Sequence, residues 1–188
     1  MRTVFQTTNL TSANVAFQPS RTYAQVVRGT RSFQATPRGV SGLCKAMVLD
    51  WIRASIPNGV NSTAELRGQQ SLTIAMGAMG YGQAQDSNSA FDLFGLRYVA
   101  HQHNIDRVAF DQMTSGVNPG YWLIALKNAS GQGHALGFRR GGQEADVFDP
   151  NRGCYRGTLA EAQLLVYGMR TRHYAFLPNL SVIQLNPG

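Results

Sequence analysis

The chain contains few cysteines, and this scarcity excludes a fold held together by disulfide bonds. Only two occur among 188 residues, at Cys44 and Cys154. Small secreted domains that depend on disulfides carry several bridges, whereas free thiols are typical of reducing compartments. We therefore expect both cysteines to be free thiols.

Long hydrophobic runs, metal-binding patterns and cofactor motifs are also missing. No apolar segment approaches the length of about 20 residues that a membrane helix needs, and the first residues lack the hydrophobic segment of a secretory signal. His101 and His103 could supply two metal ligands, but no cysteine or carboxylate stands at a matching interval, so we interpret them as a solvated helix end. The glycine-rich stretch 77–82 lacks the Lys-Ser/Thr ending of a phosphate loop. We expect neither a metal nor a cofactor.

Lysine is nearly absent, whereas arginine is abundant. The chain has 15 arginines, two lysines and a net charge of +7, and Arg21, Arg28, Arg31 and Arg38 all precede Cys44. Such a bias suits nucleic acid, an anionic membrane surface or an acidic protein. Because no nucleic-acid motif and no basic run with interleaved aromatics is present, we do not expect nucleic acid. An anionic membrane surface or an acidic protein stays open as a partner.

Length and composition predict one domain over residues 1–188. With 43% hydrophobic residues the chain can bury one sizeable core, and nothing in the sequence indicates a second one. Residues 1–30 are rich in Ser, Thr, Asn and Gln, which is typical of an N-terminal arm or a delivery segment. Short strand-like pieces lie near residues 2–6 and 22–27.

A helix with one buried stripe is predicted from residue 43 to 56. Its apolar side chains recur at intervals of three and four residues, and the stretch Pro57-Asn58-Gly59 ends it. Cys44 then falls in the first turn, where free backbone N–H groups and the helix dipole favour a thiolate. This position suits a cysteine nucleophile, and the same amides could hold an oxyanion.

A hairpin is predicted from residues 133–140 and 143–149, joined by a tight turn at Gly141-Gly142. In that register His134 lies directly opposite Asp149, with the two Cβ atoms about 4.5–5.5 Å apart on one face. Leu136, Phe138, Ala145 and Val147 would share this face. An imidazole paired with a carboxylate in this way is the arrangement of a general base and the group that orients it.

The remaining pattern indicates an α+β fold with helices first and an antiparallel sheet later. Helices are expected from 62 to about 77, from 89 toward 101, and from a capping sequence at 158–161. The segment 121–126 is apolar on both faces, as in a central strand, and 173–177 and 181–185 could extend the sheet.

Each candidate site residue also has an ordinary structural interpretation. A cysteine on an apolar helix is more often a small core residue, and a histidine on a strand often only satisfies a local hydrogen bond. The stretch Asp149-Pro150-Asn151-Arg152-Gly153 also suits a turn that stops a strand. The occurrence of Cys44, His134 and Asp149 in this order, with a register that joins two of them, favours a catalytic triad.

The chain resembles the papain-like cysteine proteases of the YopT and AvrPphB type, effectors that bacteria inject into host cells. The resemblance rests on Gly42-Leu43-Cys44 leading into Trp51-Ile52, on the stretch 133–139 around His134, and on Phe148-Asp149-Pro150-Asn151-Arg152-Gly153. It implies a papain-like α+β fold in which a helical part carrying the nucleophile packs against an antiparallel sheet carrying His and Asp. It also implies that Cys44 is the nucleophile, His134 the general base and acid, and Asp149 the group that holds the imidazole.

The resemblance further implies a virulence effector that is secreted by a bacterium and acts on a host protein in the host cytoplasm. Papain-like enzymes usually place a side-chain amide five or six residues before the cysteine, where it completes the oxyanion hole. Here Gly39 and Arg38 stand at those positions, and the nearest upstream amide is Gln34.

Two other functions stay open. A Cys-His-Asp site could instead deamidate glutamine or transfer acyl groups, or the chain could be a catalytically silent basic binding module.

Overall fold

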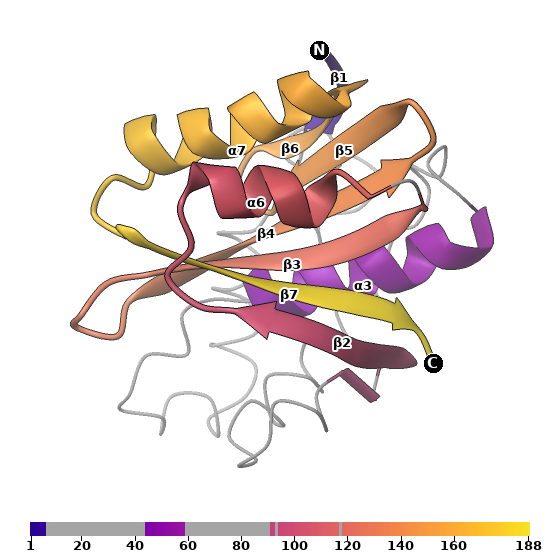
Figure 1. The fold of residues 1–188 in the computed structure, drawn as a ribbon, viewed down its shortest axis with the longest axis horizontal. Coiled ribbons are helices and arrows are strands. Elements are labelled where there is room, and N and C mark those ends of the chain that lie inside the picture. Colours follow the sequence, from indigo (N-terminus) through magenta and orange to yellow (C-terminus); the bar gives the residue numbers. More distant parts are fainter. Residues whose placement is uncertain (7–43, 59–90, 93, 117) are drawn as a thin grey trace.

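The fold is a seven-stranded antiparallel sheet with helices on both faces (Figure 1). The computed structural model describes residues 1–6, 44–58, 91–92, 94–116 and 118–188. In spatial order the strands are β1 (Arg2–Gln6), β6 (Gly153–Thr158), β5 (Glu144–Asp149), β4 (Gly133–Gly141), β3 (Gly120–Lys127), β7 (Asn179–Pro187) and β2 (Leu96–Gln102). The α+β class expected from the sequence is confirmed.

Within the described ranges, two helices cover one face of the sheet and one long helix covers the other. Helices α6 (Arg107–Thr114) and α7 (Leu159–Arg172) lie on the face turned to the viewer in Figure 1, and α3 (Cys44–Asn58) lies behind the sheet. The main core fills the space between the sheet and α6 and α7. Its buried residues are Phe110, Trp122, Ile124, Leu126, Leu136, Phe138, Ala145, Val147, Ala162, Val166, Met169, Tyr174, Leu177, Leu180 and Val182.

Helix α3 packs against β4 at a position where β4 has a glycine. A Cβ atom on Gly137 would lie 2.7 Å from the Trp51 ring, a distance at which something must shift. Trp51 is fully buried and stacks on Phe148 of β5, with ring centroids 5.4 Å apart. The glycine therefore sets the distance between the sheet and the helix that begins at Cys44.

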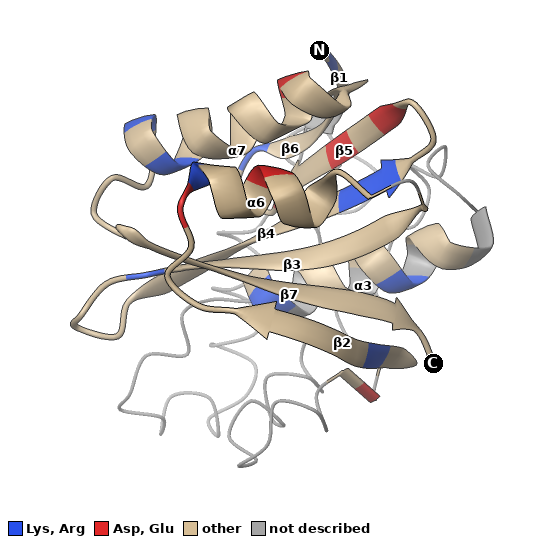
Figure 2. Cartoon of the chain, viewed as in Figure 1, with Lys and Arg blue, Asp and Glu red and all other residues tan. Residues whose placement is uncertain are grey.

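The sequence explains how the helices begin. Thr158 and Glu161 form a complete capping box at the start of α7, as the sequence predicts. Asp106 caps α6 by accepting a hydrogen bond of 2.9 Å from the backbone N–H of Ala109. Figure 2 shows an acidic residue in the first turn of α7 and basic residues in its last turn, which matches the helix dipole.

Several predicted elements occur where the sequence places them. The strand pieces at 2–6, 121–126 and 181–185 are parts of β1, β3 and β7, and the helix predicted at 43–56 corresponds to α3. Cys44 and Cys154 are free thiols. The segments 22–27, 62–77 and 77–82 and the four upstream arginines lie outside the described residues, as does most of the expected arm over residues 1–30.

Residues 91–92 are helical, but the expectation that a helix runs from 89 toward 101 is wrong beyond them. Residues 96–102 form β2, which pairs with β7. Gly95 has a φ of 61°, the left-handed conformation that ends a helical turn. The strand-favouring residues Tyr98 and Val99 follow it. The segment 173–177 is likewise no strand, because His173 caps α7 and a turn leads from Tyr174 to Leu177.

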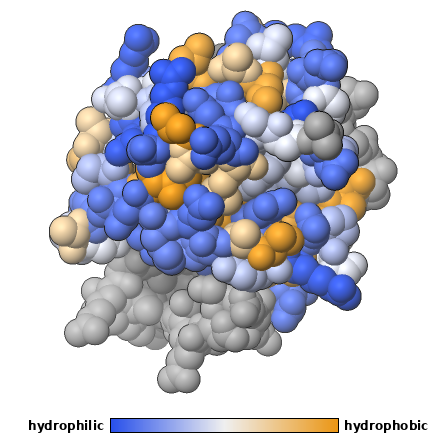
Figure 3. All heavy atoms as spheres, viewed as in Figure 1, coloured by the Kyte–Doolittle hydropathy of each residue, from blue (hydrophilic) through white to orange (hydrophobic). Residues whose placement is uncertain are grey.

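The surface of the described part mixes polar and apolar side chains. On the face shown in Figure 3, apolar residues form separate patches among hydrophilic ones. The exposed large hydrophobic residues include Val108 of α6 and Leu164 of α7. None of the helices in the described ranges has the length and hydropathy that crossing a membrane would require.

Candidate active site

Cys44 is the first residue of α3, where the sequence analysis expects it. The backbone N–H groups of a first helical turn have no partner within the helix, and they carry the positive end of the helix dipole. The residue is 9% exposed, and it borders an open pocket rather than lying sealed in the core. A substrate in the pocket could therefore reach the sulfur.

His134 is the second residue of β4, directly after a short loop that is held by its own hydrogen bonds. In this loop the Asn128 side chain accepts a hydrogen bond of 3.0 Å from the backbone N–H of Gln132, and its amide donates one of 2.8 Å to the Gln132 side chain. From there β4 pairs with β3 along its length, with His134 opposite Leu126. The loop and the pairing with β3 together fix the backbone that carries the imidazole.

Asp149 ends β5 and begins the turn to β6. The backbone N–H of Arg152 donates a hydrogen bond of 2.9 Å to the Asp149 carbonyl, and the N–H of Asn151 donates one of 2.9 Å to its carboxylate. A carboxylate that accepts from the backbone two residues later forms an Asx turn. The segment 149–153 is therefore the strand-stopping turn expected from its composition, and the same turn fixes the carboxylate.

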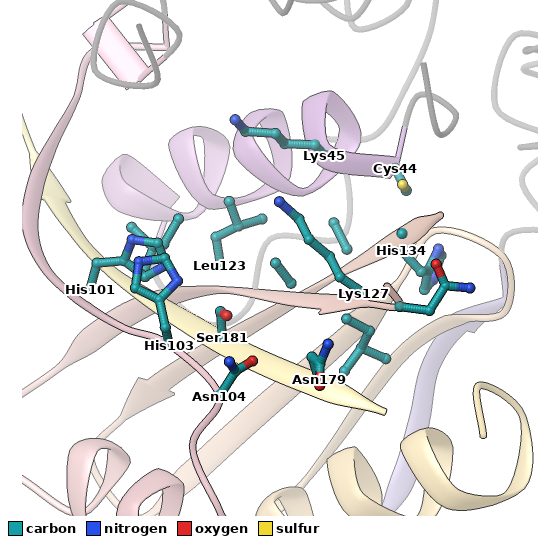
Figure 4. Close-up of a pocket in the computed structure, with 16 residues that line it drawn as sticks. Cys44, Lys45, His101, His103, Asn104, Leu123, Lys127, His134, Asn179 and Ser181 are labelled. Atoms are coloured by element: carbon teal, nitrogen blue, oxygen red, sulfur yellow. The ribbon is translucent and has the colours of Figure 1, made fainter. Parts of the chain in front are cut away.

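The three sequence-predicted residues are brought together. The His134 Nε2 atom donates a hydrogen bond of 2.9 Å to Asp149 Oδ1, and both side chains are buried. The Cys44 side chain lies within hydrogen-bonding reach of the same ring. Since Nε2 is engaged by Asp149, the other ring nitrogen, Nδ1, is left for the thiol. Figure 4 shows Cys44 and His134 close together at one end of the pocket.

The predicted register of the hairpin is wrong by two residues, although the contact is right. Gly141 pairs with Glu144, so the turn consists of Gly142 and Gln143. Gly142 has a φ of 65°, and a glycine at the first turn position is typical of a type II′ turn. The β4–β5 pairing ends at Gly137 and Phe148. His134 and Asp149 are therefore not direct cross-strand partners and meet beyond the paired region. A shift of two residues keeps every side chain on its face.

The surroundings of His134 stabilise its protonated form. Burial on its own lowers the pKa of His134, but hydrogen bonds to Asp149 and Cys44, together with their charges, raise it to about 9. The imidazolium is therefore the prevailing form at neutral pH. This is the form that can pair with a thiolate and later donate a proton.

Tyr174 completes this group of side chains, and the sequence analysis did not identify it. Its hydroxyl donates a hydrogen bond of 2.8 Å to Asp149 Oδ2, and its ring stacks on His134 with centroids 4.3 Å apart. Burial and the Asp149 charge raise the pKa of Tyr174, so the phenol stays a donor. Asn151 donates in turn to the Tyr174 hydroxyl over 3.3 Å. No local motif indicates this role, because Tyr174 lies in the turn after α7 and comes near Asp149 only through the fold.

A pocket of about 330 Å³ lies beside the cysteine and the histidine. It is formed by the start of α3, the ends of β3 and β2, and the starts of β4 and β7 (Figure 4). His101 and His103 line it at the end of β2, so the interpretation of these residues as a solvated helix end is wrong. The two rings are 3.6 Å apart between centroids.

A buried ionic network fixes α3 to the sheet, and the sequence analysis did not predict it. Asp146 of β5 accepts hydrogen bonds from its two cross-strand neighbours, 2.8 Å from Arg139 and 2.7 Å from Arg156. Arg139 also donates to the Ser55 hydroxyl of α3 and lies 4.7 Å over the Trp51 ring. Because Arg139 is only 1% exposed, these contacts replace the water that its charge has lost.

Other parts of the expected site lie beyond what the structure describes. Gln34, Arg38 and Gly39 fall outside the described residues. Among the described residues there is no group of three or more His, Cys, Asp or Glu side chains that could hold a metal ion.

Comparison with known proteins gives a match at the level of the fold. No protein-family model matches the chain, and no curated protein matches it either. Among solved structures, the chain is similar to the Pseudomonas avirulence protein AvrPphB, with a TM-score of 0.62 and 14% sequence identity. The match covers 77% of this chain and 91% of the AvrPphB chain. The chain thus has the α+β fold of AvrPphB, and the resemblance noted in the sequence is confirmed for the fold.

Proposed function

We propose that the protein is a papain-like cysteine endopeptidase in which Cys44 is the nucleophile, His134 the general base and acid, and Asp149 the orienting carboxylate. One observation carries the proposal: the His134 ring contacts Cys44 on one side and Asp149 on the other, at the edge of an open pocket. A nucleophile, a base and an orienting group in contact are the working parts of thiol catalysis.

The reaction begins with a proton already on His134. The Cys44 thiolate attacks the substrate carbonyl carbon, and the electron pair of the C=O bond moves onto oxygen. As the tetrahedral intermediate collapses, the C–N bond breaks and His134 donates its proton to the leaving amine. His134, now neutral, takes a proton from water, which attacks the thioester and releases Cys44. Asp149 keeps Nε2 occupied throughout and stabilises the imidazolium without taking its proton.

The start of α3 supplies part of the stabilisation of the oxyanion. The backbone N–H of Cys44 belongs to the first turn, where the helix leaves donors free and its dipole favours negative charge. A second donor from outside the described residues completes the hole in this proposal, with Gln34 as the candidate side chain. Preorganised donors of this kind are typically worth about 3–4 kcal/mol of transition-state stabilisation each.

In its biological setting the enzyme is a virulence effector that a bacterium secretes and that cleaves a protein in the host cytoplasm. The fold shared with an avirulence protein supports this setting. The net charge of +7 supports an acidic protein or an anionic membrane surface as an additional contact. Residues 1–30 are proposed to include the delivery segment, although residues 2–6 also form the edge strand β1.

Incubation with host-cell lysate tests the protease proposal. Sequencing of new peptide termini should show cleavage products with the unmodified protein and none with Cys44→Ala. Cys154→Ala is a matched control, because Cys154 is also a buried free thiol but lies in β6, and it should retain cleavage. Circular dichroism verifies that each variant is folded.

Two other outcomes would replace the proposal. A one-dalton mass increase on glutamine, or an added acyl group, without new termini would identify a deamidase or an acyltransferase, since these reactions also pass through a thioester. Equal product patterns from the unmodified protein and Cys44→Ala would refute thiol catalysis, and the absence of any product with either protein would favour a catalytically silent basic binding module.

A further inference from the structure

Both lysines of the chain lie in the pocket next to Cys44. The sequence contains 15 arginines but only these two lysines, Lys45 and Lys127, and both line the pocket. Lys45 follows Cys44 in the first turn of α3. Lys127 ends β3, where it pairs with Gly133 on one side and Asn179 on the other. Figure 4 shows both side chains among the residues that line the pocket, with Lys127 reaching toward α3, the helix that carries Lys45.

The basic groups of the pocket repel one another. Partial burial and the charge of Lys127 lower the pKa of Lys45, although its side chain still reaches solvent. Burial, His103 and Lys127 lower the pKa of His101. A cluster of like charges in a confined space is costly, and an anion placed among them would relieve the repulsion.

No carboxylate compensates these charges within the described part of the chain. The described residues that line the pocket include no Asp or Glu. Neither lysine takes part in an ion pair among the described residues, and Lys45 instead lies 5.3 Å over the Phe91 ring. Asn104, Asn179 and Ser181 add uncharged hydrogen-bonding groups to the same wall.

We propose that this pocket binds the carboxylate of an aspartate or glutamate in the substrate, close to the bond that Cys44 attacks. The proposal rests on the proposed function and adds the class of substrate to it. Lysines attract an anion as point charges, and the described lining contains no arginine, whose planar fork would bind a carboxylate or a phosphate through two hydrogen bonds. A carboxylate is the anion that an unmodified peptide carries. The cavity of about 330 Å³ has room for one acidic side chain with water. Cleavage should therefore be selective for peptides with an acidic residue beside the scissile bond.

Alkylation of Cys44 tests the charge of the pocket without any substrate. Iodoacetate carries a carboxylate and iodoacetamide does not, so the rate with iodoacetate divided by the rate with iodoacetamide reports the electrostatic potential near Cys44. We expect Lys45→Gln/Lys127→Gln to lower this ratio by roughly tenfold, or about 1.4 kcal/mol. Arg97→Gln/Arg172→Gln removes the same net charge from exposed positions away from the pocket and should leave the ratio unchanged. Added salt should lower the iodoacetate-to-iodoacetamide ratio of the unmodified protein, because salt screens the lysine charges.

Digestion of a peptide library tests the selectivity itself, with aspartate, glutamate, asparagine, glutamine and phosphoserine at each position around the cleavage site. We expect aspartate or glutamate at one fixed position among cleaved peptides, and loss of that preference in the double lysine variant. Preference for phosphoserine over both acidic residues would overturn the assignment to a carboxylate. An unchanged alkylation ratio or an unchanged cleavage profile would overturn the pocket proposal while thiol catalysis stands. Failure of Cys44 to react faster than a free thiol would instead refute the proposed function.

Discussion

Replacing Asp149 with asparagine should lower the pKa of His134. The pKa of His134 is about 9 instead of 6.5, although burial acts in the opposite direction. Its imidazolium is therefore stabilised by on the order of 3 kcal/mol, all of it from Asp149 and Cys44. Asparagine keeps the shape and one acceptor oxygen but removes the charge. Since a neighbouring carboxylate typically accounts for about one to three pH units, we expect the His134 pKa to fall by that amount.

The same interaction makes the stability of the protein depend on pH. A group whose pKa is raised in the folded state stabilises the fold fully below its unfolded pKa and loses this effect as pH rises through its folded pKa. For His134 this window runs from 6.5 to about 9. The free energy of unfolding should fall across it by on the order of 3 kcal/mol. The decrease should be clearly smaller in Asp149→Asn, which is also less stable at pH 6.5.

Two measurements check this prediction. Imidazole nitrogen NMR, assigned with a His134→Gln variant, gives the pKa of His134, and the exposed His173 serves as an internal reference. Urea unfolding at pH 6.5 and pH 9 gives the change in stability. A His134 that titrates near 6.5 in the unmodified protein, or that titrates identically in Asp149→Asn, would refute the reasoning.

Three substitutions test the parts that hold the site in place. Gly137→Ala should force the Trp51 ring and α3 away from the sheet, so the free energy of unfolding, measured by calorimetry, should fall by about 1–3 kcal/mol and cleavage should slow. Unchanged stability would contradict the packing of α3 against Gly137. Asp146→Ala leaves two buried guanidinium groups without their carboxylate, so the free energy of unfolding measured with urea should fall by about 3–5 kcal/mol. A decrease below about 1 kcal/mol would show that the fold does not depend on this network. Tyr174→Phe keeps the ring but removes a donor to Asp149, so kcat should fall more than KM changes, with about 1.5–3 kcal/mol lost in stability. The exposed Phe176→Leu is its control, and equal kinetics in both variants would refute the role of Tyr174.

Local patterns in the sequence were sufficient to predict the elements that carry the site. The apolar spacing of α3, the turn residues after β5 and the capping box of α7 each depend on neighbours within a few positions. The pairing of His134 with Asp149 also followed from the sequence, because alternation along a strand survives a register error of two residues. The exact turn residues could not be predicted from the sequence, since Gly141 and Gly142 both tolerate a tight turn. Only the pairing of the two strands selects Gly142 with Gln143.

Features that depend on distant segments could not be predicted in the same way. β2 is stabilised by its pairing with β7, which lies about 80 residues later in the sequence, and tertiary pairing overrides local helix preference. Tyr174 reaches Asp149 from the turn after α7, and Asp146 joins two strands to α3 through Arg139. Contacts of this kind leave no periodic signal, because each partner is a single residue on a different element.

The rate of Cys44 alkylation by iodoacetamide as a function of pH tests the central claim most directly. If Cys44 is a nucleophile in contact with a protonated His134, it should react faster than a model thiol at pH 6, and His134→Ala should abolish this advantage. Cysteine peptides mapped by mass spectrometry should place the label on Cys44 and not on Cys154, which is fully buried. A Cys44 that reacts no faster than the model thiol at pH 6, or equally fast with and without His134, would contradict the account.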